Sequence, residues 1–597
     1  MSGELRPPPG LVASASKKSP RLFILFLVTS ILGFGLIDRG PWRGGDLYGM
    51  ALIKNCVDAF NGISTSCIVP NLYGSVLAND GPLFTWIASS LIIITDLYFQ
   101  NVFNHRFDIN YMDDLGRVIQ SFFVLLGLII LWFGAKKLAM RKESKPNDPL
   151  GIGPTSEKFS SNIADCCVLI TISCLGLIMP LHELGKTGLN FMLHAAIFWA
   201  IVIAPEMPKR AGTVFGITSS LLFLCSGIGP FFSVNLAIFI ICFNCYPWTL
   251  VKKIFIVRSL LSCLIIISPI ILYILDKESD KLVHSWWELQ FIIDKARPLF
   301  LIKTWLWTWW PLWPIVTAFS IQAYSRQFIS LSHLKMPLIF LFCLVLAPLA
   351  GIFISDGTKF IPIVPLAVLA AFGLLSLPRN VANLIDYFAL SIFTFLAIMI
   401  WVYWLALHTG IPETIQNNVL RAAPGTSGFY SIKEVTLGMS ATFAWLLLIG
   451  WRIRVSEPLI WRPVILSAGG LSMTWILLVN LWGPALEINR GYAEITRNIS
   501  FVVERYFSNP KDFCIGVKSD DFKSRAIILA NSDYRLNHSK KEKFFDCQFI
   551  LMRNTLFANS NVATQNSFNM SDWKLAWSGN RKADPRKKET FYLYKKN

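Results

Sequence analysis

The sequence predicts a polytopic α-helical membrane protein with a small C-terminal domain of α/β or α+β type. The 597 residues are 54% hydrophobic and only 15% charged, whereas a soluble protein carries about 25% charged residues. Apolar runs long enough to cross a bilayer recur from Arg21 to Trp482, which is the pattern of a helical membrane protein. From Glu487 to Asn597 the composition becomes polar and mixed, which indicates a domain outside the membrane.

The N-terminal tail, residues 1–21, contains three consecutive prolines and the pair Lys17-Lys18. It resembles the basic start of a signal peptide, but no small-residue cleavage site follows the first apolar run, 22–37. We therefore expect a retained signal anchor with its tail in the cytoplasm.

The position of the next apolar run, Pro82–Leu97, decides the topology of the chain. If it crossed the membrane, the basic loop Lys136–Lys145 would face outside, against the positive-inside rule. The run is of modest length and contains Asp96, so we expect it to lie in the interface. Residues 38–118 then form one large external loop that contains interfacial helices.

The later apolar runs alternate so that the basic loops between them face inside. Counting them gives about thirteen spans, an odd number that places the C-terminus outside. A transmembrane domain, 22–486, then precedes a C-terminal external domain, 487–597. The expected spans are 22–37, 119–135, 163–181, 189–205, 212–225, 230–245, 254–275, 305–324, 338–355, 361–377, 388–407, 435–450 and 464–482.

Short apolar runs in the C-terminal domain read as strands: Ala526–Ala530, Phe549–Met552 and Thr590–Tyr594. The twelve cysteines show no zinc-type spacing, and no metal site is predicted. Most of them lie in or beside apolar runs and read as small hydrophobic residues. In an oxidising compartment Cys514–Cys547 is a plausible disulfide, and Cys56–Cys67 is a weaker candidate.

The net charge of +18 raises the question of nucleic-acid binding. The basic residues cluster between the spans and in the tail, where they set topology and face anionic lipid. We therefore expect membrane lipid, and no nucleic acid, as a partner.

The segment directly after the first span is dense in charge, glycine and aromatic residues. Asp46 lies there, at the start of an expected amphipathic helix, 47–60. Its carboxylate suits a general base acting on an acceptor hydroxyl or amine, and the alternative is a helix cap. Arg39 and Arg43 flank it and suit a phosphate, or they snorkel to the interface.

Two aromatic residues of this segment, Trp42 and Tyr48, read most simply as interfacial aromatics. Asp80 lies later in the same loop and is either a second site carboxylate or a turn residue before Gly81-Pro82.

Two further short external loops carry ionisable groups. The first holds His182, Glu183 and Lys186, and the second holds Lys359. Three ionisable groups at a membrane face suggest function, and Lys359 suits an anionic substrate. In both loops the alternative is a solvated turn.

Several of these segments together resemble one family of proteins. They are Pro41–Asp46, Gly81–Trp86, His182-Glu183, Asp356–Pro365, Trp482–Tyr492 and Trp577–Tyr594. They resemble motifs of the bacterial integral-membrane glycosyltransferases related to 4-amino-4-deoxy-L-arabinose transferase, which share a superfamily with the protein O-mannosyltransferases. The similarity is patchy but extends over nearly the whole chain.

The resemblance implies a GT-C fold and transfer of a sugar from an undecaprenyl-phosphate donor on the periplasmic side of the bacterial inner membrane. The acceptor would be lipid A, another envelope glycan or a protein, and no cofactor is implied. Asp46 would orient or deprotonate the acceptor, with Asp80 as a second catalytic carboxylate. The substrate would be bound by Tyr48, by the loop residues His182, Glu183 and Lys186, and by the basic side chains Arg39, Arg43 and Lys359.

The chain also departs from the family pattern. Leu47 stands where the family has a second acidic residue, no lysine precedes Gly81-Pro82, and Leu184 replaces a methionine. Two other functions therefore stay open: a transporter or flippase for a lipid-linked sugar, and a non-catalytic membrane scaffold derived from the same fold. A transporter predicts paired ionisable residues deep in the spans, whereas the charges here sit mainly at the boundaries.

Overall fold

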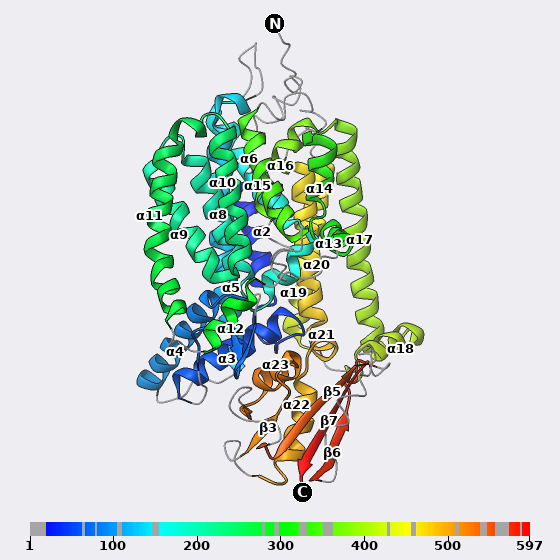
Figure 1. Ribbon diagram of the computed structural model, residues 1–597. Helices are drawn as coiled ribbons and strands as arrows, with labels where there is room; N and C mark the ends of the chain where they lie inside the picture. Colours follow the sequence, from blue (N-terminus) through cyan, green and yellow to red (C-terminus); the bar gives the residue numbers. More distant parts are fainter. Residues whose placement is uncertain are drawn as a thin grey trace.

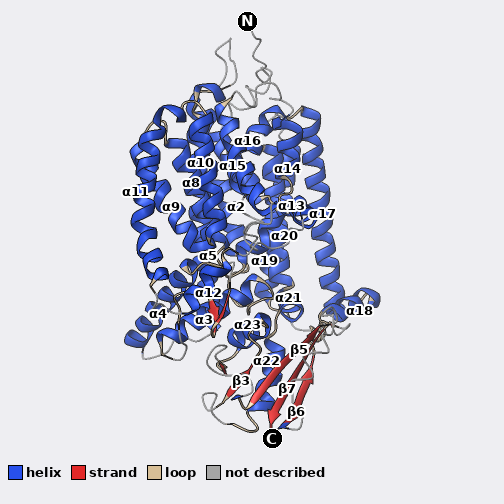
Figure 2. Ribbon diagram, viewed as in Figure 1, coloured by secondary structure: helices blue, strands red, loops and turns tan. Residues whose placement is uncertain are grey.

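The computed structural model describes most of the chain. The described residues are 19–62, 66–77, 80–103, 110–145, 154–276, 281–291, 298–321, 331–349, 362–426, 430–454, 461–507, 513–537, 546–555, 572–584 and 588–597. Figure 1 shows a bundle of long helices with a small domain at one end that holds the C-terminus. Strands are confined to that end (Figure 2).

The helices follow the apolar runs of the sequence. The longest, α5, α11 and α17, exceed the roughly 20 residues that cross a bilayer. The helices are α2 (Arg21–Gly33), α3 (Gly45–Phe60), α4 (Leu83–Phe103), α5 (Asn110–Ala139), α6 (Ser156–Ile172), α7 (Ile178–His182), α8 (Thr187–Ile203), α9 (Pro208–Ser226), α10 (Ile228–Asn244), α11 (Trp248–Leu275), α12 (Lys281–Leu289), α13 (Pro298–Thr308), α14 (Leu312–Ile315), α15 (Ser332–Leu349), α16 (Ile363–Gly373), α17 (Arg379–Thr409), α18 (Glu413–Ala422), α19 (Ile432–Arg454), α20 (Arg462–Leu481), α21 (Gly483–Arg490), α22 (Ala493–Val503) and α23 (Phe522–Asn531).

Within the described residues each predicted span overlaps helical structure, but the total of about thirteen is not confirmed. Residues 322–324, 350–355 and 361 of the predicted spans lie outside the described part of the chain. Seven described helices are long and apolar enough to cross a membrane, or eight if α6 and the segment Leu175–His182 form one span bent by 60°. Other apolar helices, such as α8 and α10, are shorter. The expected span 305–324 is divided between α13, which ends at Thr308, and α14, which begins at Leu312. An apolar run in the sequence therefore predicts a helix more securely than a full crossing.

Helix α4, which we expected to lie in the interface, is 21 residues long and qualifies as a span by length and composition. Figure 1 shows it at the lower end of the bundle, beside α3. Its position relative to the membrane stays a prediction.

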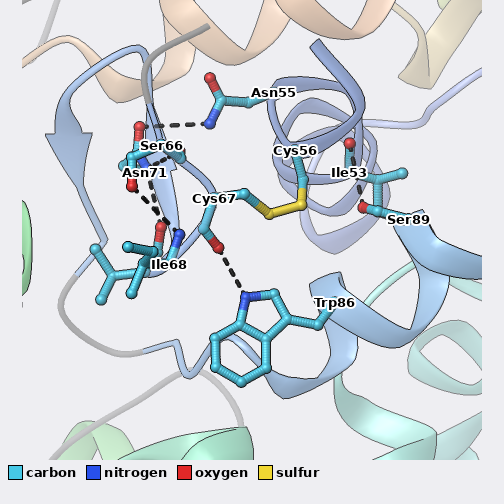
Figure 3. Close-up of a disulfide and its surroundings, with 10 residues drawn as sticks. Ile53, Asn55, Cys56, Ser66, Cys67, Ile68, Asn71, Trp86 and Ser89 are labelled. Carbon is cyan, nitrogen blue, oxygen red and sulfur yellow. Dashed lines mark hydrogen bonds between the residues drawn. A yellow bond between two sulfur atoms is a disulfide. The ribbon is translucent and has the colours of Figure 1, made fainter. Parts of the chain in front are cut away.

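A disulfide between Cys56 and Cys67 links α3 to the chain that follows it, as the weaker of the two cysteine predictions proposed. Figure 3 shows Trp86 of α4 against this bond, where its Nε1 donates to the carbonyl oxygen of Cys67 at 2.7 Å. Ser89 of α4 donates to the carbonyl oxygen of Ile53 at 3.3 Å. The first loop is therefore a packed unit of α3, α4 and the small hairpin β1 (Asn71–Leu72) and β2 (Ser75–Val76).

The C-terminal domain contains a five-stranded mixed sheet of order β4-β3-β5-β7-β6, which confirms the predicted small domain. The disulfide Cys514–Cys547 is also present. The outer pairings β5–β7 and β6–β7 are antiparallel, and β3 is parallel to both of its neighbours. The strands are β3 (Cys514–Gly516), β4 (Arg535–Leu536), β5 (Phe549–Thr555), β6 (Trp573–Gly579) and β7 (Glu589–Lys596).

Of the three predicted strand runs, 549–552 and 590–594 lie in β5 and β7, but Ala526–Ala530 is wrong as a strand. It forms the middle of α23, whose first turn is capped by Asp521 accepting from the Ser524 amide. All five residues of the run are buried. A short apolar run that is buried on every side reads alike as strand or helix, and the cap resolves the ambiguity.

The C-terminal domain is anchored to the first loop by polar contacts, one of which is fully buried. Arg525 of α23 has no exposed surface, and its Nη1 donates to the carbonyl oxygen of Leu72 at 3.2 Å. Lys54 of α3 forms an ion pair with Asp533 at 2.6 Å. These contacts join β1 and α3 of the first loop to the C-terminal domain. The candidate site lies at the start of α3.

Candidate active site

Asp46 is completely buried in the first turn of α3, and both of its carboxylate oxygens are fully used. Its Oδ2 accepts from Arg39 Nη1 at 2.7 Å and from the Trp42 amide at 3.2 Å. Its Oδ1 accepts from the Leu184 amide at 2.7 Å and from Arg117 Nε at 3.2 Å. Burial alone would raise the pKa of Asp46, but the charges of Arg117 and Arg39 outweigh it and the pKa is lowered.

The second cation on Asp46 belongs to a group that the sequence reasoning missed. Arg117 of α5 has no exposed surface and also pairs with Asp113 at 2.8 Å and with Asp114 at 2.9 Å. The spacing of three and four residues on one helix face is a signal for such pairs. The long-range partner Asp46 has no such local signal. Asp46 and Arg117 therefore join α3 to α5.

Arg39 and Trp42 are part of the buried framework of the site. The Arg39 side chain is 8% exposed, lies 4.1 Å from the Trp42 ring centre and donates to carbonyl oxygens, including that of His182. Trp42 is buried, and its Nε1 donates to Glu487 at 2.8 Å. The interpretation of Trp42 as an interfacial aromatic is wrong, because a long-range partner covers it.

His182 is also buried at the end of α7. Its two ring nitrogens contact the carbonyl oxygens of Ile178 at 2.5 Å and Ile31 at 2.6 Å. Its ring lies 4.3 Å from that of Trp475. These contacts hold the start of the 183–186 loop against α2 and α20.

Glu183, the next residue, is partly exposed, in contrast to Asp46. Burial, followed by the charge of Asp46, raises its pKa to about 7, and Arg39 and Arg490 offset only part of this rise. The carboxylate lies against the N-terminus of α3. A Cβ on Gly45 would come within 2.8 Å of Glu183 Oε2, and Gly44 has a φ of +110°, which favours glycine. The Gly44-Gly45 pair therefore makes room for Glu183.

Lys186 ends the same loop and forms an ion pair with Asp80 at 2.5 Å. Next to Asp80, Gly81 donates its amide to the carbonyl oxygen of Cys225 at 3.1 Å. A Cβ on Gly81 would lie 2.0 Å from the carbonyl oxygen of Leu224, so only glycine fits. Lys186 therefore lies beside the Asp80-Gly81 segment, where the glycosyltransferase motif described above has a lysine that this chain lacks.

The loop 183–186 accordingly brings three of the sequence motifs together, with Glu183 at α3, the Leu184 amide on Asp46 and Lys186 on Asp80. Lys359 lies outside the described residues, as does the rest of its loop.

Arg490 borders Glu183, and Arg43 borders Arg490. Arg43 is exposed, and its amide donates to the carbonyl oxygen of Arg490 at 2.9 Å. Burial, and then the charge of Arg43, lowers the pKa of Arg490, whereas Glu183 raises it. Arg490 also lies 5.8 Å from the Trp42 ring centre on the side of α21. No carboxylate pairs with the Arg43 side chain among the residues that the structure describes.

The C-terminal domain adds a polar network beyond Arg490. Tyr492 donates to Glu589 at 2.9 Å, and the same carboxylate pairs with Lys523 and with Arg553 at 3.4 Å. Burial would raise the pKa of Glu589, but its hydrogen bond and charge interaction with Lys523 leave it lowered. Tyr48 of α3 is half-buried and lies near Arg553. The sequence did not predict this network, because its residues are spread over about a hundred positions and no local spacing connects them.

The geometry suits a proton transfer next to a bound anion. Glu183 has a pKa of about 7, which is suited to a general base at neutral pH. Arg490 lies beside it, Arg43 lies beside Arg490, and both guanidinium groups suit phosphate oxygens. Asp46 has the opposite properties, because it is buried, ionised and saturated with donors. Among the described residues no group of three or more His, Cys, Asp and Glu side chains has the geometry to hold a metal ion.

Replacing Gly49 with alanine is expected to destabilise the site framework. The new Cβ would lie 2.1 Å from the carbonyl oxygen of Leu184, so α3 must shift from the 183–186 loop. We expect a loss of about 1–3 kcal/mol, measured as a lower thermal midpoint of the purified protein in detergent. Gly185→Ala, in open space on the same loop, is the control, and an equal midpoint for both variants would contradict the close approach.

Comparison with known proteins agrees with this architecture. No family model and no curated protein sequence matches the chain. Among solved structures, ArnT from Cupriavidus metallidurans bound to undecaprenyl phosphate is similar with a TM-score of 0.62 and 10% identity, over 96% of this chain and 97% of that one. The apo form of ArnT gives a TM-score of 0.59 over the same shares.

The oligosaccharyltransferase of Archaeoglobus fulgidus is more distant, with a TM-score of 0.44 over 88% of this chain and 61% of that one. The likeness to ArnT shows that the chain has an ArnT-like fold, as the sequence resemblance predicted. It includes nearly the full length of both chains.

Proposed function

We propose that the protein transfers a sugar from a polyprenyl-phosphate donor to an acceptor of the bacterial cell envelope. The observation that carries the proposal is the juxtaposition of Glu183, with a pKa of about 7, and Arg490, beside which Arg43 lies. Support also comes from the fold, because the similar ArnT structure is bound to undecaprenyl phosphate. Such a lipid carries the phosphate that a pair of arginines would bind.

The reaction would take place at the junction of α3, the 183–186 loop and α21. Glu183 takes the proton of the acceptor hydroxyl or amine, whose oxygen or nitrogen forms a bond to the anomeric carbon of the sugar. The bond between that carbon and the phosphate oxygen breaks, and the electron pair leaves with the polyprenyl phosphate. Arg43 and Arg490 stabilise the charge that develops on this phosphate.

The buried residues of the site act as positioning residues in this proposal. Asp46 holds the Leu184 amide and Arg39, and so sets the course of the loop that carries Glu183. His182 anchors the same loop on its other side. Lys186 and Asp80 pair at the far end of the loop, and this ion pair would contact a polar group of the substrate. Tyr48 faces the C-terminal network and would contact the acceptor.

The site lies at the same end of the molecule as both disulfides (Figure 1). Disulfides persist in oxidising compartments such as the bacterial periplasm. This supports a periplasmic site in an inner-membrane protein, with the N-terminal tail in the cytoplasm and the C-terminal domain in the periplasm.

The proposal is tested with the purified full-length protein and an undecaprenyl-phosphate sugar labelled in the sugar. Envelope lipid and glycan extracts serve as acceptors, and the readouts are labelled product and released undecaprenyl phosphate. Both are expected to appear together. If the labelled lipid moves across vesicle membranes and no product forms, the protein is a transporter and the proposal is wrong. If neither transfer nor movement is found, the protein is a non-catalytic scaffold.

Replacing Arg43 with alanine is expected to weaken donor binding. The side chain is exposed, so the fold should be unaffected, whereas a charge-assisted contact to phosphate contributes about 1.5–3 kcal/mol. The KM for the donor should therefore rise by about tenfold or more. Arg497→Ala removes an exposed arginine of α22 and serves as the control. An unchanged KM in the Arg43 variant would remove it from the phosphate site.

A further inference from the structure

A second candidate binding site lies at the other end of the helical bundle, away from the C-terminal domain. It is an open cavity of about 770 Å³ between α5, α8, α9 and α11. One part of its lining is apolar and the other is cationic. The apolar side chains are Phe133, Met140, Trp199, Ile203, Met207 and Val214, and the cations are Lys136, Lys137, Lys209, Arg210 and Arg258.

The cations of this cavity outnumber the carboxylates near them. Lys137 pairs with Glu206 at 2.7 Å, and Lys136 lies 3.8 Å from the largely exposed Glu157. Lys209, Arg210 and Arg258 form no ion pair with any carboxylate in the described part of the chain. Three uncompensated cations around one cavity favour an anionic ligand.

Close packing of two helices holds Arg258 over the cavity. A Cβ on Gly212 of α9 would lie 2.9 Å from the Cβ of Arg258 and 2.5 Å from the carbonyl oxygen of Phe255. Glycine therefore allows α9 to approach α11 closely, and Arg258 comes beside the first turn of α9 with Lys209 and Arg210. The cationic part of the cavity is formed by residues of both helices.

The apolar part is open to the surroundings of the bundle. Phe133 is 53% exposed and Met207 is 49% exposed. An exposed apolar wall next to cations at the end of a transmembrane bundle matches the two parts of a phospholipid, the acyl chain and the charged headgroup. A free inorganic anion would use only the cationic part.

We propose that this cavity binds one anionic phospholipid. The phosphate of the headgroup contacts Lys209, Arg210 and Arg258, and an acyl chain lies along Phe133, Trp199 and Val214. The lipid would bridge α5, α9 and α11 on the side of the membrane opposite to the candidate active site. It is distinct from the donor and the acceptor of the proposed reaction, so the inference does not depend on that reaction.

The alternative to a specific lipid site is the general attraction of basic loops to anionic lipid. A matched pair of variants distinguishes specific binding from this general attraction. Lys252 and Lys253 lie on α11 at the same end of the bundle but do not line the cavity. Lys209→Ala with Arg210→Ala and Lys252→Ala with Lys253→Ala remove the same charge. Only the first pair removes cations from the cavity.

The experiment is native mass spectrometry of the full-length protein, titrated in detergent with phosphatidylglycerol or with phosphatidylcholine of the same acyl chains. We expect one retained phosphatidylglycerol and weaker retention of phosphatidylcholine. The Lys209/Arg210 double variant should bind phosphatidylglycerol at least about tenfold more weakly, and the Lys252/Lys253 variant should bind it as the unchanged protein does. Arg258→Ala should weaken binding about fivefold.

A neutral change tests the apolar part. Val214→Trp narrows the apolar part of the cavity without altering charge and should also reduce retention of phosphatidylglycerol. Thermal midpoints confirm that each variant is folded. Equal loss in the two double variants, equal binding of both lipids, or displacement of phosphatidylglycerol by millimolar inorganic phosphate would each overturn the proposal. The last result would indicate a free-anion site instead.

Discussion

Replacing Glu183 with glutamine is expected to lower the rate of sugar transfer by about 10²–10⁴-fold, the contribution of a general base. Glutamine has nearly the same shape, so it can occupy the space beside Gly44 and Gly45 without changing the packing there. The variant should keep its thermal midpoint and its KM for the donor. The measurement is the turnover of labelled polyprenyl-phosphate sugar, with Glu504→Gln, an exposed carboxylate of the C-terminal region, as the control.

The pH dependence of transfer tests the same residue. Burial raises the pKa of Glu183 to about 7, and a base acts only when it is deprotonated. Transfer should therefore rise as the pH increases through about 7 and level off above it. The Glu183→Gln variant should lose this rise. Full activity of the variant, or the same pH profile in both proteins, would exclude Glu183 as the base.

Replacing Asp46 with asparagine is expected to destabilise the protein rather than to act on chemistry alone. The substitution leaves the buried guanidinium of Arg39 without its carboxylate and removes one of three carboxylates around Arg117. Breaking a buried pair by removing one partner costs about 3–5 kcal/mol. We expect a lower thermal midpoint and reduced yield, with loss of transfer as a consequence.

Asp113→Asn is the matched control for Asp46→Asn. It removes one carboxylate from Arg117 but leaves Asp46 and Asp114 in place, so its thermal midpoint should fall by less. If Asp46→Asn instead keeps the native midpoint and loses transfer, Asp46 takes part in the chemistry directly, as its position in the motif suggested.

The sequence predicted which segments of the chain would form the site, but it did not predict the roles within it. The segments that contain Asp46, Asp80, Glu183 and Lys186 do meet around the 183–186 loop. The motif made Asp46 the preferred base, whereas the structure leaves Glu183 partly exposed beside Arg490. Burial and the number of donors around a carboxylate depend on residues such as Arg117, whose contact with Asp46 no local spacing predicts.

By itself the sequence determined the membrane class and predicted helices over the long apolar runs, because apolar runs act through local periodicity and the bilayer. It also offered Cys514–Cys547 and Cys56–Cys67 as candidate disulfides. The tertiary structure alone decided which of these helices are long enough to span, and that Ala526–Ala530 is helical. It also decided that Trp42 is covered and that Asp46 is saturated with donors. These outcomes depend on contacts between distant parts of the chain, such as Trp42 with Glu487, and those contacts set burial and charge pairing.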